Sequence, residues 1–242
     1  MRSIKSAQFA AMWTRARATR WGLGTSVGTV LLVWFLLRVR TSHRPGWPLA
    51  WVWPNDWRWV AIHLVADVVT VILPVASVIT VVGLEHDLLN RRRDLFAAYP
   101  TRAMTIMGSH GAVVAALDGG VVMMAVLLPW IRGWAMPPWI VLAMVLPSML
   151  ALGGLAAFVA ELARSPWPGL LAAWAWAGAS IAAMGYRVVP PLPLEVLFYT
   201  DSYSMTSVTW VNSAVTLVVA LLLWGGAGWL MERARAQGRD AA

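Results

Sequence analysis

Residues 139–162 read WIVLAMVLPSMLALGGLAAFVAEL, and the first charged side chain in this stretch is Glu161. A helix of about 20 apolar residues crosses the ~30 Å hydrocarbon core of a bilayer. The apolar residues form one continuous run and do not repeat at the period of an amphipathic helix or strand. The stretch therefore predicts a transmembrane helix.

The composition of the whole chain indicates the same class. Of the 242 residues, 60% are hydrophobic and 12% are charged, and the mean hydropathy is +0.66. A soluble domain of this length carries about 25% charged residues. We therefore expect an all-α, polytopic transmembrane helical bundle, with a six-helix transmembrane domain over 21–231 and a cytoplasmic tail over 232–242. The six predicted spans are 21–37, 59–84, 104–130, 139–162, 167–186 and 206–231.

The first 20 residues predict an amphipathic helix that lies in the membrane interface. Phe9, Met12, Trp13 and Ala16 fall at three- and four-residue steps and are surrounded by basic residues. A cleaved signal peptide is the alternative interpretation. It is disfavoured because the following apolar run ends at Arg38 without a small-residue cleavage site.

Basic residues predict how the chain is oriented. With the N-terminus inside, 13 of the 19 Lys and Arg residues lie in the internal segments, which favours cytoplasmic termini. We expect a multi-pass protein of the cytoplasmic (inner) cell membrane. The net charge of +8 then indicates contact with an anionic lipid leaflet rather than with nucleic acid. The chain has no cysteine, which excludes disulfides, thiolate metal sites and cysteine nucleophiles.

The segment 83–112, GLEHDLLNRRRDLFAAYPTRAMTIMGSHGA, is the most informative for function. It predicts a membrane exit at Glu85, a short charged helix that carries Leu95 and Phe96, and a break at Tyr99-Pro100. Apolar side chains on a charged cytoplasmic helix need a place to be buried. They either insert into the membrane interface or dock into a groove on a partner protein.

This pattern of residues resembles the type-2 ABC-transporter permeases. The shared features are Glu85 at the end of the second span, the charged helix with an apolar pair, and Pro100-Thr101-Arg102 before the third span. The family often has a Gly-Thr pair in this helix, where this chain has Asn90 and an arginine run. The resemblance implies a cytoplasmic coupling helix over 85–102 that fits a cleft on an ATPase subunit. The implied ATPase contacts are Glu85, Arg91, Arg92, Asp94, Leu95, Phe96, Pro100 and Arg102.

The resemblance implies a membrane-spanning permease subunit of an ATP-driven exporter that moves an amphipathic or lipophilic substrate. The sequence has no G-x-x-x-x-G-K-[ST] phosphate loop, so we expect no enzyme activity or cofactor on this chain. ATP and Mg²⁺ would bind the partner ATP-binding cassette subunit. A second copy of the chain or a related permease would complete the translocation unit. The alternative is a non-transporting membrane scaffold or sensor that docks a cytoplasmic partner.

Three ionisable residues lie well inside predicted spans, away from the span ends, where each is costly unless it is paired or hydrated. They are His63 and Asp67 in the second span and Asp118 in the third. These side chains either line a translocation path or form a hydrogen-bonded cluster that fixes helix packing. A metal site on His63 and Asp67 would need a further ligand and is not expected. An intramembrane enzyme would also depend on these three residues, but the sequence has no H-E-x-x-H motif, and the serine in Gly108-Ser109-His110-Gly111 lies in the wrong order for a protease.

Overall fold

The computed structural model describes residues 72–98, 102–131, 137–185 and 207–237, together with four isolated positions between 24 and 31. Within these ranges the chain is all-helical and contains no strand. The five long helices are α4 (Leu73–Ala98), α5 (Ala103–Ile131), α6 (Pro138–Ala163), α7 (Pro166–Gly185) and α8 (Ser207–Ala236). The predicted N-terminal helix 1–20 lies outside the described residues, as do nearly all of the first span and the first half of the second.

The bounds of α5 to α8 follow the apolar runs of the sequence within a few residues, except at the end of α8. Two helix starts are set by proline, because Pro138 and Pro166 occupy first-turn positions where a missing N–H costs nothing. Between them, α6 ends at Arg164, whose backbone is left-handed with φ of 56°. The N–H groups of Arg164 and Ser165 both bond to the carbonyl of Ala160, which closes the helix and turns the chain into α7.

Three of the described helices are long and apolar enough to cross a membrane. The segments are Ala103–Leu127 in α5, Pro138–Ala163 in α6 and Val211–Ala236 in α8. The fold class is thus an all-helical membrane protein with three candidate spans in the described part of the chain. The helix α7 has 20 residues and does not fall in this set.

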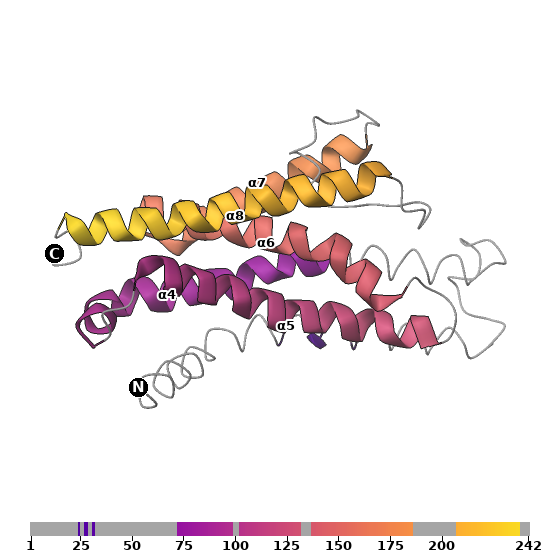
Figure 1. Ribbon diagram of the computed structural model, residues 1–242, viewed down its shortest axis with the longest axis horizontal. Coiled ribbons are helices and arrows are strands. Elements are labelled where there is room, and N and C mark those ends of the chain that lie inside the picture. The colour runs from indigo at the N-terminus through magenta and orange to yellow at the C-terminus, as the bar shows by residue number, and fades with distance from the viewer. Residues whose placement is uncertain are drawn as a thin grey trace, which may run out of the picture.

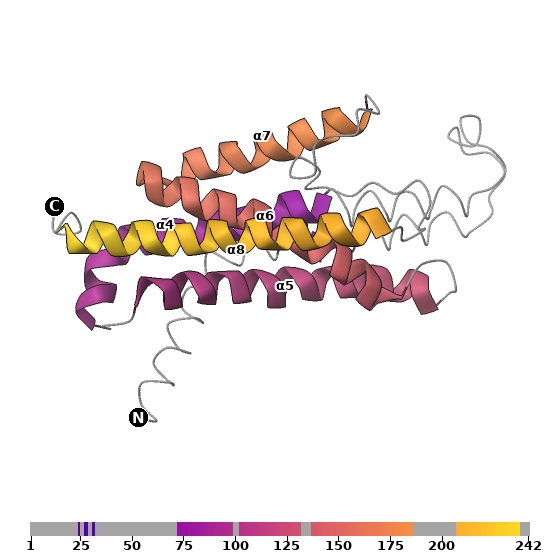
Figure 2. The same ribbon diagram turned by 45° about the horizontal axis from the view of Figure 1, so that its top comes forward.

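The helix α4 differs from the prediction of a span that ends at Leu84 followed by a separate helix. It is one unbroken helix through Glu85 to Ala98. No proline interrupts the backbone ladder over this stretch, and Leu88 remains fully buried beyond the predicted exit. The last turns of α4 bend away from the bundle before the chain enters α5 (Figure 2). The helix ends two residues before Pro100, where the residue preceding a proline disfavours helical backbone.

The bundle is organised around α6, which contacts each of the other four described helices (Figure 1). Small residues allow these close contacts, as expected for helices packed in a membrane. A β-carbon at Gly169 of α7 would overlap the carbonyl oxygen of Ala156 in α6. Gly153 and Gly154 of α6 lie against the indole of Trp224 in α8, and the Trp224 Nε1–H donates to the carbonyl of Leu150 at 3.0 Å.

The outer surface of the bundle is apolar in the middle and carries aromatic residues at both ends. On α8 the exposed apolar side chains are Val211, Leu217, Val218, Leu221 and Leu222. At one end of the bundle the rings of Trp130 and Trp139 pack edge to face, with centroids 5.4 Å apart. At the opposite end Arg233 lies over the Trp229 ring. This arrangement is typical of helices whose middle faces lipid and whose ends lie at the headgroups.

Candidate functional site

Polar side chains line one face of α4, which is otherwise apolar. Ser77, Thr80 and Glu85 are all fully buried, and their spacing places them on one side of the helix. The opposing face of α5 presents His110 and Asp118, which are two helical turns apart and are also buried. The two helices run antiparallel, so the polar groups meet in two pairs at different depths. These pairs form the candidate site.

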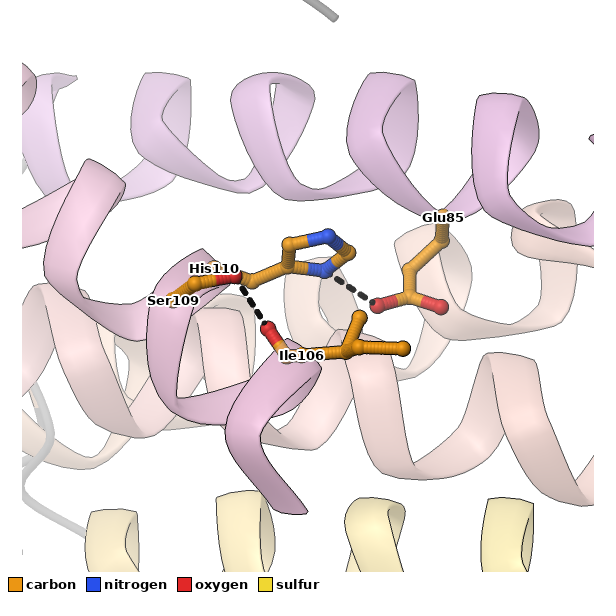
Figure 3. A network of polar contacts seen from close by, with 4 residues as sticks. All are labelled: Glu85, Ile106, Ser109 and His110. Atoms are coloured by element: carbon orange, nitrogen blue, oxygen red, sulfur yellow. Dashed lines mark hydrogen bonds and ion pairs between the residues drawn. The ribbon is translucent and has the colours of Figure 1, made fainter. Parts of the chain in front are cut away.

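The first pair is Glu85 and His110 (Figure 3). Their side chains are 0% and 1% exposed, and the His110 Nδ1 lies 3.2 Å from the Glu85 Oε1. The hydrogen bond between the imidazole and the carboxyl group offsets part of the cost of burying them, because a lone carboxylate at this position would carry a large desolvation cost. The second oxygen, Oε2, has no hydrogen-bond partner within the described ranges.

The hydroxyl of Ser109 is directed away from this pair. Ser109 Oγ donates to the carbonyl of Ile106 at 2.6 Å, one turn earlier in the same helix. Figure 3 shows the imidazole of His110 pointing toward Glu85 and the Ser109 hydroxyl pointing toward Ile106. The two neighbouring residues are thus not arranged as a nucleophile and its base, which require mutual hydrogen-bond contact.

The second pair is Thr80 and Asp118. The Thr80 Oγ1 lies 3.5 Å from the Asp118 Oδ1, which is at the outer limit for a hydrogen bond. Asp118 is 2% exposed, and its Oδ2 has no hydrogen-bond partner in the part of the chain that the structure describes. No described group of three or more His, Asp or Glu side chains has the geometry of a metal centre.

The residues predicted to contact the ATPase subunit fall into three groups in the structure. Glu85 is closed to solvent, so in this arrangement its carboxylate faces His110 rather than the surface. Arg102 is exposed at the start of α5. The side chains of Arg91, Arg92, Asp94, Leu95 and Phe96 belong to α4 but lie outside the described side chains, and Pro100 lies outside the described residues.

Of the three residues predicted to line a translocation path, Asp118 lies in the described part of the structure. His63 and Asp67 lie outside the described residues. Sequence reasoning missed His110 as a partner. Glu85 lies 13 residues before the end of α4, whereas His110 lies seven residues after the start of α5, so no symmetric spacing pairs the two residues. The available signal is only that a short connection favours an antiparallel arrangement of the two helices.

The end of the bundle that holds the α4–α5 connection also holds the described basic residues. Arg102, Arg164, Arg233 and Arg235 lie in or next to the start of α5, the end of α6 and the end of α8, which Figure 1 shows toward the same end of the bundle. Here Glu232 of α8 accepts a hydrogen bond from the backbone N–H of Ala103 at 3.1 Å. A carboxylate is favourable at a helix N-terminus, so this contact ties the end of α8 to the start of α5.

Comparison with known proteins identifies no relative. No protein-family model, no curated protein and no solved structure matches the chain. The functional argument therefore rests on the residues and on their arrangement.

Proposed function

We propose that the chain is the membrane-spanning permease subunit of an ATP-driven ABC exporter. It crosses the cytoplasmic membrane six times with both termini inside, pairs with a second permease, and moves an amphipathic or lipophilic substrate outward. A separate ATP-binding cassette subunit binds ATP and Mg²⁺ and supplies the energy. The residue pattern from Glu85 to Arg102 is the source of this proposal.

The observation that carries the proposal is the continuity of α4. The helix runs without a break from the buried Glu85 to Ala98, beyond which the chain turns into α5. The segment that holds Leu95 and Phe96 is therefore part of the same continuous helix as the buried Glu85, with its last turns bent away from the bundle. Ten residues separate Glu85 from Leu95, which is about 15 Å measured along the helix. We call the part of α4 that holds Leu95 and Phe96 the outer segment. A force applied to it would act on the packing of α4 against α5 and α6.

The orientation of the bundle supports the same proposal. The exposed basic residues Arg102, Arg164 and Arg233 gather at the end where α4 leaves the bundle. Basic residues remain on the cytoplasmic side of a membrane protein. The segment of α4 that holds Leu95 and Phe96 then faces the cytoplasm, where the proposed ATPase subunit binds ATP.

The experiment that tests the proposal is co-purification with a candidate ATPase. A candidate ATPase, taken from a reading frame adjacent to that of this chain where one encodes an ATP-binding cassette, is co-expressed with the affinity-tagged full-length protein, and the complex is recovered from detergent extract. We expect Leu95→Asp and Phe96→Asp to abolish recovery of the ATPase, because an acidic group cannot be buried in an apolar cleft. We expect Gln237→Asp to leave recovery unchanged, because Gln237 is exposed at the same end and the change adds the same charge.

Two outcomes would contradict the proposal. Failure of the wild-type chain to bind any ATPase would favour the scaffold or sensor interpretation. Equal recovery with wild type, Leu95→Asp and Phe96→Asp would show that the outer segment of α4 is not the contact surface. Size-exclusion chromatography of each variant verifies that a lost interaction does not reflect a misfolded bundle.

A further inference from the structure

Asp118 is an uncompensated carboxyl group in the middle of the bundle. It lies 15 residues from the start of α5 and 13 from its end, about 20 Å from either end. Its side chain is 2% exposed, and Oδ2 has no hydrogen-bond partner among the described residues. An ionised carboxylate at this depth is costly unless a positive charge accompanies it.

No described charged side chain lies at the level of Asp118. The neighbouring Gly119 sits against Leu142 of α6, and Glu161, the first charged residue of α6, is 19 residues further along that helix. Gly111 sits against Trp224 of α8, and the buried polar side chains that precede Trp224 on α8, Asn212, Ser213 and Thr216, are uncharged. On α8 the first charged residue is Glu232, and α7 contains none.

The titratable side chains nearest to Asp118 along α4 and α5 interact with each other. On α4 the nearest in the described part is Glu85, five residues from Thr80, and on α5 it is His110, eight residues from Asp118. These two side chains form the pair described above, so neither supplies a free positive charge. The only described polar contact of Asp118 is the Thr80 hydroxyl.

The separation of the two oxygens is at the long limit of a hydrogen bond, and it also fits two ligands of one cation. The Thr80 Oγ1 and the Asp118 Oδ1 are 3.5 Å apart, whereas O–H···O bonds are typically about 2.7–2.8 Å. Two oxygens that bind one ion at about 2.4 Å and at right angles lie about 3.4 Å apart. A larger ion would force them further apart.

We propose that Asp118 and Thr80 form a binding site for one sodium ion between α4 and α5. The carboxylate supplies the single negative charge that a monovalent ion balances, and the threonine supplies a neutral oxygen. Hard oxygen ligands suit such a cation, and one carboxylate is too little charge for tight binding of Ca²⁺. The free Oδ2 is a further ligand. Binding would join the two helices at mid-depth, whether or not the chain partners an ATPase.

The test measures whether sodium stabilises the purified full-length chain in detergent. Thermal unfolding is followed by the fluorescence of its tryptophans, in NaCl or in choline chloride at equal ionic strength and constant pH. A ligand that binds only the folded state stabilises it by RT ln(1 + [L]/Kd), so the unfolding temperature rises with ligand concentration and the curve gives Kd. We expect NaCl, but not choline chloride, to raise the unfolding temperature of the wild-type chain.

Two variants test whether the sodium response of the unfolding temperature depends on Asp118 and Thr80. Asp118→Asn should remove the sodium response, and Thr80→Val should raise the half-saturating sodium concentration about tenfold through loss of one oxygen ligand, worth about 1.4 kcal/mol. Glu85→Gln, which alters the other described buried carboxyl on α4 and α5, should keep the wild-type response. If Asp118→Asn does not fold, Thr80→Val decides the question, since it retains the charge.

Three results would overturn the proposal. One is an equal response to NaCl and choline chloride. Another is an unchanged sodium response in Asp118→Asn or in Thr80→Val. The third is a response to lowered pH without any response to sodium, which would assign the charge at Asp118 to a proton. Because no ATPase is present, these results are independent of the co-purification experiment.

Discussion

Removing one partner of the Glu85–His110 pair should destabilise the bundle far more than removing both. In His110→Leu the Glu85 carboxyl is left in a site with no solvent contact and no described partner on either oxygen. Breaking a buried ion pair from one side costs about 3–5 kcal/mol, whereas replacing both partners with apolar residues is often close to neutral. We therefore expect about 3–5 kcal/mol for either single leucine variant and clearly less than the sum for Glu85→Leu/His110→Leu.

The coupling energy is measured with a double-mutant cycle. Unfolding of the four proteins in mixed detergent and SDS gives the free energy of each, and the difference between the double variant and the sum of the singles isolates the pair. We expect at least about 2 kcal/mol of coupling. Additive effects would refute the reasoning, because they would mean that the two side chains do not interact across α4 and α5. His86→Leu, an exposed position one residue from Glu85, is the control and should be nearly neutral.

Two further predictions concern the contacts around α6. Gly169→Ala should destabilise the protein by about 1–3 kcal/mol or more, because its β-carbon would overlap the backbone of Ala156; Gly178→Ala on the same helix meets no atom within 4 Å and should change stability little in the same SDS titration. Trp224→Phe should cost about 1 kcal/mol through loss of the hydrogen bond to Leu150, and an unchanged midpoint would show that this bond does not contribute.

The helices of the described part could be predicted from the sequence because membrane spans are local features. A run such as 139–162 must be helical to satisfy its backbone in lipid, and proline and glycine then mark the ends. The prediction at α4 differs from the structure in one respect. A separate helix was expected after Leu84, but a charged side chain does not interrupt a backbone hydrogen-bond ladder, and α4 continues through Glu85 to Ala98. No proline lies between Glu85 and Ala98.

The site could be predicted only in part, since it depends on how helices are placed against each other. The sequence shows that Asp118 lies inside a span, but Thr80 is a partner only in one register of α4 against α5. His110 was interpreted as a residue near the start of a span, whereas its ring is fully buried against Glu85. Long-range pairs of this kind, 25 and 38 residues apart in sequence, leave no periodic signal.

Under the proposed function, contact with the ATPase and transmission of its motion would fall on different residues of α4. Resemblance to the permeases implies that it touches the partner ATPase, yet the structure closes its side chain inside the bundle. In this arrangement the buried and paired Glu85 fixes α4 to α5 and does not meet another protein. Under the proposed function, the segment that holds Leu95 and Phe96 would make the contact, and the continuous helix would carry its motion to Glu85. The pair would resist displacement of α4 along α5, because such a displacement leaves the Glu85 carboxyl without its hydrogen-bond partner.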